Sequence, residues 1–135
     1  MSHYTNGDVN IKDPKCLIAA LEEEVPAWAG HIEYHVTPQN LYGYHGDKKA
    51  QVANVIIRRA QVGSASNDIG FLFQNGKCEA IVSDYDRHRY GQAWLNRITA
   101  ESGVQAVLAR AKARGERVSV DRTDRNKVKL IVSAR

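Results

Sequence analysis

The amino-acid sequence predicts an α+β fold, in which two helical segments pack on one face of a mostly antiparallel sheet. Short segments of alternating or β-branched apolar residues recur along the chain and are typical of strands. Two longer segments carry apolar residues at helical spacing. Asn75-Gly76 stands between two apolar runs and is typical of a tight hairpin turn. The predicted order is β-α-β-β-β-β-α-β-β, with the outer face of the sheet left to water or to a partner.

The chain is expected to begin with a weak strand over residues 2–11, near an edge of the sheet, because this stretch is polar with a few β-forming residues. A helix is predicted next. Asp13 suits its N-cap, Pro14 suits its first helical position, and Pro26 ends it. Apolar residues recur at helical spacing between these points, so the acidic run at residues 22–24 is expected to be the solvated face of the helix.

The middle of the chain predicts four strands and the loops between them. Strands are expected at residues 31–36, 51–58, 68–74 and 77–83, with a turn at 37–40 and loops at 43–49 and 62–67. The segment 51–58 is rich in β-branched residues and is the best candidate for a buried strand. The two strands that flank Asn75-Gly76 are expected to form a hairpin, because both turn residues tolerate positive φ.

The last third of the chain predicts a polar loop, a helix and a second hairpin. Residues 84–91 form the loop, and apolar residues from Trp94 to Ala111 follow a helical stripe. Gly103 interrupts this stripe, so we expect a bend or two helical pieces. Strands are expected at 117–122 and 127–134, joined by a turn at 123–126.

Size and composition favour one domain over residues 1–135. Apolar residues make up 43% and charged residues 25% of the chain, which is the usual globular mixture and excludes collagen, coiled coil and disorder. No stretch approaches the ~20 apolar residues of a membrane span, and the first residues lack the features of a signal peptide. We therefore expect no membrane contact and a cytoplasmic location. Cys16 and Cys78 have no metal-ligand spacing and are expected to be free core thiols.

Charge is distributed unevenly along the chain, although the net charge is only +4. Residues 1–40 hold two basic and six acidic side chains, whereas residues 101–135 hold nine basic and four acidic ones. This asymmetry fits a nucleic-acid surface or a complementary contact between copies of the chain. It also fits charged side chains that simply solvate an exposed helix and hairpin.

Two segments before residue 50 carry residues with possible ligand chemistry. His31 and His35 have a zinc-like spacing, but four residues along a strand span about 13 Å, which is too far for one metal. Tyr44 and His45 lie between two glycines and are followed by two lysines, a combination that could contact a phosphate. Two glycines also serve a plain strand-to-strand turn, and the segment matches no known nucleotide-binding motif.

The loop over residues 84–90 concentrates charged and aromatic side chains. An acid–base pair of Asp84 or Asp86 with His88 can be drawn there. No serine or cysteine nucleophile stands in a recognisable catalytic setting. A plain connection between a strand and a helix is therefore favoured over ligand binding, and ligand binding over catalysis. We therefore expect no enzymatic activity, no metal and no cofactor.

Several short motifs follow one another along nearly the whole chain. They are Met1-Ser2-His3-Tyr4, Ile11-Lys12-Asp13, Gly43-Tyr44-His45-Gly46, Val55-Ile56-Ile57-Arg58, Asp68-Ile69-Gly70-Phe71, Asn75-Gly76 and Val128-Lys129-Leu130-Ile131-Val132. In this order and spacing the chain resembles the conserved hypothetical chloroplast reading frame number thirty-five family, a domain of unknown function with cyanobacterial, bacterial and phage relatives. The resemblance implies a small soluble protein of the cytoplasm or plastid stroma, without family catalytic residues. It also implies an accessory role beside an ATPase of the AAA type.

The leading functional hypothesis is a non-enzymatic protein-interaction module that contacts a copy of itself or an AAA-type ATPase. The alternative is a nucleic-acid-binding protein that uses a basic C-terminal surface and contacts the phosphate backbone without reading sequence. That surface comprises Arg110, Arg114, Arg117, Arg122, Arg125, Lys127 and Lys129. Because residues 101–135 contain no aromatic side chain, base stacking is not expected there.

Overall fold

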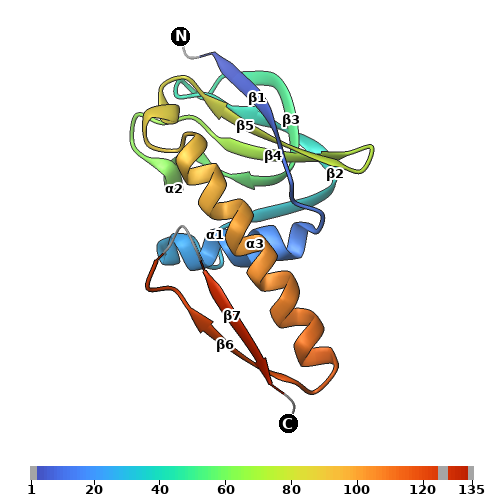
Figure 1. Ribbon diagram of the computed structural model, residues 1–135. Helices are drawn as coiled ribbons and strands as arrows, with labels where there is room; N and C mark the ends of the chain where they lie inside the picture. Colours follow the sequence, from blue (N-terminus) through green and yellow to red (C-terminus); the bar gives the residue numbers. More distant parts are fainter. Residues whose placement is uncertain (1–2, 125–127, 134–135) are drawn as a thin grey trace.

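A computed structural model of the chain describes residues 3–124 and 128–133 (Figure 1). A five-stranded antiparallel sheet has the spatial order β1-β5-β4-β3-β2, and β6 and β7 form a second, two-stranded sheet. The strands are β1 (Tyr4–Val9), β2 (Glu33–Tyr42), β3 (Lys48–Ile57), β4 (Ile69–Gln74), β5 (Lys77–Ser83), β6 (Arg117–Asp121) and β7 (Lys129–Ser133). The helices are α1 (Pro14–Glu24), α2 (Arg59–Val62) and α3 (Gln92–Ala113), with short 3-10 turns at Pro26–Trp28 and Asp86–His88. The predicted fold class and element order are confirmed.

Local signals set the first helix and the central hairpin as the sequence predicts. The Asp13 carboxylate accepts the Lys15 N–H at 2.9 Å, and Pro14 occupies the first helical turn, where its missing N–H needs no partner. Asn75 and Gly76 have φ values of 56° and 73°, and they join β4 to β5. Positive φ at both positions matches the right-handed twist of the strands that they connect.

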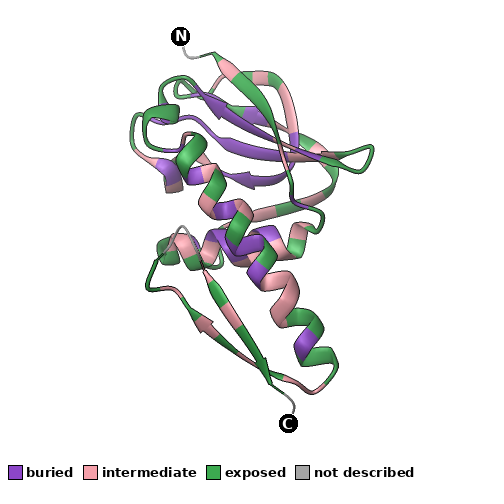
Figure 2. Cartoon of the chain, viewed as in Figure 1, coloured by how far each residue is buried: buried purple, intermediate pink, exposed green. Residues whose placement is uncertain are grey.

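The main core lies between the sheet and the helices α1 and α3, which cover one of its faces (Figures 1 and 2). Alternating residues of β3, β4 and β5 point into it, and Leu17 and Leu21 of α1 are fully buried against them. Aromatic rings fill the space under α3. The Trp94 ring lies 5.0 Å from the Tyr90 ring and 6.1 Å from the Trp28 ring, both edge to face. This rigid core holds the ends of the strands, and therefore their loops, in place.

The outer face of the sheet is partly covered, which corrects the expectation that it faces only water or a partner. Leu41 of β2 is fully buried there with Ala53, Ile56 and Ile81. Gly70 makes this possible, because a Cβ at that position would lie 2.9 Å from the Leu41 side chain. A small second core therefore lies between the β2–β3 hairpin and the outer face of the sheet. The loop at the tip of this hairpin lies beside the segment that precedes β4.

Two predicted features of the chain, a turn at residues 37–40 and a break at Gly103, are wrong. Residues 37–40 are not a turn but part of β2, where the register against β3 shifts between Tyr34 and Gln39. Pro38 is tolerated because β2 is an edge strand with an irregular ladder. Helix α3 is one continuous helix. Gly103 is exposed, but the residues on both sides of it are buried, and their packing stabilises the helix across the glycine. The ~1 kcal/mol penalty of a helical glycine is smaller than this packing gain.

The acidic end of α1 is engaged in ion pairs rather than simply solvated, which corrects a second expectation. Glu24 accepts from Arg97 of α3 at 2.8 Å, and Glu23 pairs with Arg122 at 3.2 Å. Arg122 also donates to both carboxylate oxygens of Glu101, which is 3% exposed. These pairs attach the β6 side of the hairpin to α1 and α3, so part of the charge asymmetry is neutralised within the chain. None of the helices in the described part is both long and apolar enough to cross a bilayer.

Candidate functional site

Loops from three parts of the chain meet at the end of the sheet where β4 begins. The Asp68 N–H donates to the Tyr42 carbonyl at 3.0 Å, which places the end of β2 against the start of β4. The Tyr4 hydroxyl donates to the Asp68 carbonyl at 2.7 Å, and burial raises the pKa of this hydroxyl. The 43–47 loop, the segment before β4 and the loop that follows β5 therefore lie beside one another.

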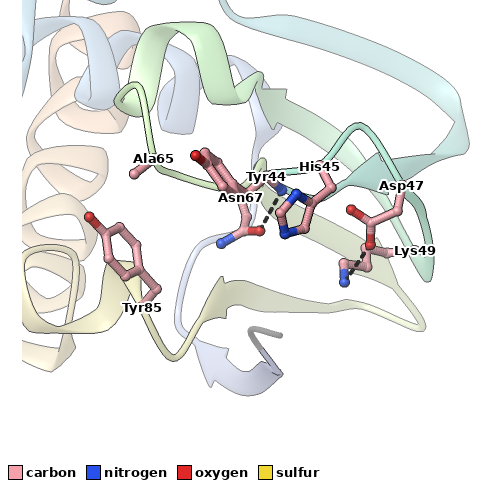
Figure 3. Close-up of a pocket in the computed structure, with 7 residues that line it drawn as sticks. All are labelled: Tyr44, His45, Asp47, Lys49, Ala65, Asn67 and Tyr85. Atoms are coloured by element: carbon pink, nitrogen blue, oxygen red, sulfur yellow. Dashed lines mark hydrogen bonds and ion pairs between the residues drawn. The ribbon is translucent and has the colours of Figure 1, made fainter.

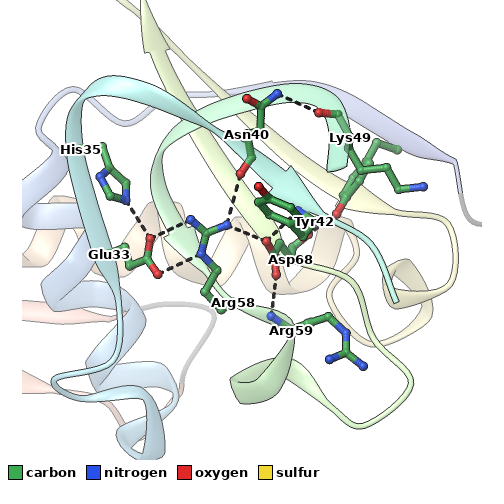
Figure 4. A network of polar contacts seen from close by, with 9 residues as sticks. Glu33, His35, Asn40, Tyr42, Lys49, Arg58, Arg59 and Asp68 are labelled. Atoms are coloured by element: carbon green, nitrogen blue, oxygen red, sulfur yellow. Dashed lines mark hydrogen bonds and ion pairs between the residues drawn. The ribbon is translucent and has the colours of Figure 1, made fainter. Parts of the chain in front are cut away.

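Buried Asp68 is the centre of the first polar network (Figure 4). One of its carboxylate oxygens accepts the Arg59 N–H at 2.7 Å, and the other accepts the Tyr42 N–H and Arg58 Nη1, both at 2.8 Å. Arg58 also donates through Nε and Nη2 to the two oxygens of Glu33, both at 2.9 Å. These hydrogen bonds lower the pKa of Glu33 and raise the pKa of Arg58. All three charges are paired, so this network orders the loops and leaves no free general base.

Asp86 forms a second buried network below the neighbouring loops, with 3% of its surface exposed. Its Oδ2 accepts the Ser83 hydroxyl at 2.8 Å and the Asn67 N–H at 3.0 Å. The Asn67 side-chain oxygen in turn accepts the Tyr44 N–H at 2.8 Å. Buried carboxylates with several donors are strong structural anchors. The network therefore connects the loop after β5 to the loop after β2 through Asn67.

A surface hollow of about 280 Å³ lies between these loops (Figure 3). We call it the tyrosine groove, and it is lined by Tyr44, His45, Asp47, Lys49, Ala65, Asn67 and Tyr85. Tyr44 and Tyr85 are about half exposed, and the Tyr44 and His45 rings lie 4.8 Å apart. At one side of the groove Lys49 and Asp47 form an ion pair of 2.8 Å, and this contact lowers the pKa of Asp47.

Arginine side chains lie over tyrosine rings around the same loops. The Arg58 guanidinium carbon is 5.8 Å from the Tyr42 ring centroid, and that of Arg59 is 5.6 Å from the Tyr44 ring centroid. A third arginine, Arg89, lies 5.4 Å from the ring of its neighbour in sequence. Such cation–π pairs hold both members in place at about 0.5–1 kcal/mol each on an exposed surface. The end of the sheet thus presents ordered aromatic and cationic groups together.

The remaining loop candidates make contacts that favour binding or structure over acid–base chemistry. Asp84 is exposed and accepts the Thr5 hydroxyl at 3.3 Å. His88 is exposed and meets the Tyr85 ring edge to face at 5.5 Å. Asp86 points instead into the buried network with Ser83 and Asn67. Within residues 3–124 and 128–133, no group of three or more His, Cys, Asp or Glu side chains could hold a metal ion.

The predicted basic C-terminal surface is only partly brought together. Arg122 is engaged with Glu101 and Glu23, and Arg114 has a long contact of 3.9 Å with Glu116. Arg114 is exposed nonetheless, as are Arg110, Arg117 and Lys129 on α3 and the hairpin. Arg125 and Lys127 lie outside the described residues. The described cations are therefore spread over a helix and a hairpin rather than gathered in one cluster.

Sequence reasoning found Tyr44, His45 and Asp86 but did not identify Arg58, Arg59, Asn67 and Asp68 as parts of one site. A local signal was present, because Asn67-Asp68 directly precedes a strand and Arg58-Arg59 directly follows one. Their partners, however, are brought together only by the sheet order β4-β3-β2.

Comparisons with known proteins found one family model that matches most of the chain. The family model described as Protein of unknown function (DUF1257) matches residues 31–131, about three quarters of the 135 residues. No curated protein matches the chain, and no solved structure does. The match confirms the prediction of a family of unknown function. It runs from β2 into β7 and includes every residue that lines the tyrosine groove. The chain therefore belongs to the family Protein of unknown function (DUF1257).

Proposed function

We propose that this chain is a protein-interaction module without enzymatic activity of its own, and that the open edge of β7 receives an extended, acidic segment of a partner protein. The observation that carries this proposal is the exposure of two large apolar residues on a short edge strand. Ile131 is 65% exposed and Val132 is 49% exposed. Successive residues of a strand point to opposite faces, so each face of β7 exposes one large apolar side chain that an added strand can cover.

The backbone of β7 supports the same proposal. In the part of the chain that the structure describes, β7 pairs with β6 alone, with Ser119 opposite Ile131 and Asp121 opposite Lys129. Its other edge therefore offers free N–H and C=O groups to an added strand. An added strand would bury Ile131 on the outward face and Val132 on the face toward α3, where the helix leaves it half exposed.

Charge around β7 favours an acidic partner over a second copy. Lys129 and Arg117 are exposed on the two strands, and Lys112 and Arg114 are exposed at the adjoining end of α3. Two copies that met at this edge would bring like charges together, whereas acidic side chains on the incoming strand would pair with them. The acidic run of α1 is engaged within the chain and does not supply the complement. The AAA-type ATPase implied by the sequence resemblance is one partner that the experiment can identify.

Position-resolved photo-crosslinking in the organism that encodes the chain tests this proposal. A photoreactive phenylalanine analogue replaces Ile131 in one variant and Val36 in the control, because Val36 is 81% exposed on the edge strand β2. We expect a crosslink from position 131 to an acidic segment of another protein, and we expect its loss in Arg117→Glu/Lys129→Glu. The double variant Lys48→Glu/Lys77→Glu, which changes exposed lysines of the main sheet, is the matched control and keeps the crosslink.

Three results would contradict the proposal. They are no crosslink from position 131 beyond that from position 36, a crosslink to a second copy of the chain, and a crosslinked segment without acidic residues.

A further inference from the structure

The loops that form the tyrosine groove are held by buried carboxylates and an amide. Asn67 and Asp86 are 2% and 3% exposed, and they fix the backbone of Tyr44 through the Asn67 side chain. Asp68 holds the backbones of Tyr42 and Arg59 in the same way. A scaffold of this kind presents the exposed rings in one arrangement before any ligand arrives, which lowers the entropy lost on binding.

The groove suits one planar group. Tyr44 and Tyr85 come from different loops and both line the hollow (Figure 3). Its volume of about 280 Å³ is close to the lower limit of the roughly 300–1,000 Å³ found for small-molecule sites. A tyrosine that stays half exposed on an ordered loop offers a flat face for stacking.

Arg59 lies beside the groove rather than in its lining, and it has no anionic partner among the described residues. Its guanidinium lies over the Tyr44 ring, and it forms no ion pair with a carboxylate among the described residues. Its Nε is buried without a hydrogen-bond partner there, and its Nη2 reaches the Ser64 carbonyl only at 3.4 Å. Arg58, one position earlier, is fully engaged by Glu33 and Asp68. The open Nη groups of Arg59 therefore favour an anionic oxygen beside the Tyr44 ring.

From these contacts we propose that the tyrosine groove binds a nucleotide unit, with its base stacked on Tyr44 or Tyr85 and its phosphate held by Arg59. The unit belongs either to a free mononucleotide or to a single-stranded nucleic acid, since both offer the same base and phosphate. Lys49 adds a second cation at the rim, although it already pairs with Asp47. The polar atoms of Asn67 are used by the scaffold, so this side chain is not free to read the edge of the base. Binding therefore depends on stacking and charge, with little preference for sequence.

Fluorescence anisotropy of the full chain with short, fluorescein-labelled oligo(dT) and oligo(dA), at low and at physiological salt, tests the proposal. We expect Tyr44→Ala or Tyr85→Ala, whichever removes the ring that carries the base, to weaken binding roughly 5- to 150-fold, which is the range for one stacked base. Tyr44→Phe keeps the ring and is expected to keep the affinity. Tyr34→Ala is the matched control, because this tyrosine is 51% exposed on β2 and lies outside the groove lining. Thermal unfolding by circular dichroism establishes that each variant is folded.

Charge variants and competitors separate the alternatives. Arg59→Gln is expected to weaken binding and to reduce its salt dependence, whereas Arg110→Gln on the C-terminal part of α3 changes neither. If AMP competes with the oligonucleotide and binds at least as tightly, the natural ligand is a free nucleotide. If the oligonucleotide binds far more tightly than AMP, the ligand is a strand.

The proposal is overturned by no binding at low salt or by equal affinity for AMP and ribose 5-phosphate. It is also overturned if neither Tyr44→Ala nor Tyr85→Ala weakens binding more than Tyr34→Ala does, or if Arg110→Gln weakens binding as much as Arg59→Gln does.

Discussion

The Asp68→Asn substitution tests whether the buried carboxylate holds the loops at the end of the sheet. The change keeps the shape of the side chain but replaces one accepting oxygen with a donating amide group. The asparagine side chain can adopt two orientations. In the more favourable one its NH2 group faces the Arg59 N–H, so this buried donor loses its acceptor at 2.7 Å. The two hydrogen bonds from Tyr42 and Arg58 remain, but they lose the charge of the acceptor.

The expected loss of stability follows from these contacts. An unsatisfied buried N–H costs about 1–3 kcal/mol, and a charge-assisted hydrogen bond is worth roughly twice a neutral one. Arg58 keeps its two bonds to Glu33, so its charge is not left without a partner. We therefore expect the free energy of unfolding to fall by about 3 kcal/mol, and the melting temperature to fall by roughly 10 °C for a chain of this length.

Urea unfolding, followed by the fluorescence of the buried Trp28 and Trp94, measures this difference. Asp47→Asn is the matched control, because it makes the same chemical change at a partly exposed carboxylate that pairs with Lys49. The reasoning is refuted if Asp68→Asn unfolds at the same urea concentration as Asp47→Asn.

Three further predictions concern the hairpin, the thiols and the outer face of the sheet. Arg122→Ala leaves the buried Glu101 carboxylate without a cation, so we expect the free energy of unfolding to fall by about 3 kcal/mol and the amides of β6 to exchange faster. Arg114→Ala is the control and is expected to show neither effect. Burial raises the pKa of Cys78 to about 12, so its reactive thiolate is scarce at pH 8. A thiol reagent should therefore modify the half-buried Cys16 first, and Cys78 only as the chain unfolds. Equal rates of modification of the two thiols in the folded chain would contradict this. Gly70→Ala would place a Cβ 2.6 Å from the Cβ of a neighbouring alanine. We therefore expect the free energy of unfolding, measured in urea, to fall by about 1–3 kcal/mol. Unchanged stability would contradict this and show that the core on the outer face is loosely packed.

Local features of the fold were predictable because the residues that decide them are neighbours in sequence. Asp13 caps a helix whose first N–H groups lie within three residues of it, and Asn75-Gly76 supplies positive φ on its own. Both signals act without any long-range contact. The α+β class and the order of the elements follow from such signals and from the apolar periodicity.

The irregular parts were not predictable, because their causes lie across the sheet. Asn54 explains the path of β2: its side chain donates to the His35 carbonyl at 2.9 Å and accepts the Phe73 N–H at 2.8 Å. These bonds satisfy backbone groups where the register shifts, so β2 continues through Pro38. No pattern in the sequence shows that Asn54 will face two strands at once.

The same reason limited prediction of the candidate site. The loop of Tyr44 and His45 was recognisable by its composition. Arg58 and Asp68, in contrast, come into contact only because β3 and β4 are neighbours in the sheet. The acidic residues of α1 look like a solvated face because their partners, Arg97 and Arg122, are far away in sequence. Sequence patterns record local structure, whereas ion pairs between distant segments depend on topology.

Hydrogen–deuterium exchange of the chain in its native complex tests the central claim most directly, namely that the β7 edge is the contact with a protein partner. We predict that the amides on the unpaired edge of β7 (Lys129–Ser133) exchange rapidly in the isolated chain and become protected in the complex. The amides of β1, an edge strand of the main sheet, are expected not to change. Protection that appears in β1 but not in β7 would contradict the claim, and so would β7 amides that exchange equally fast in both states.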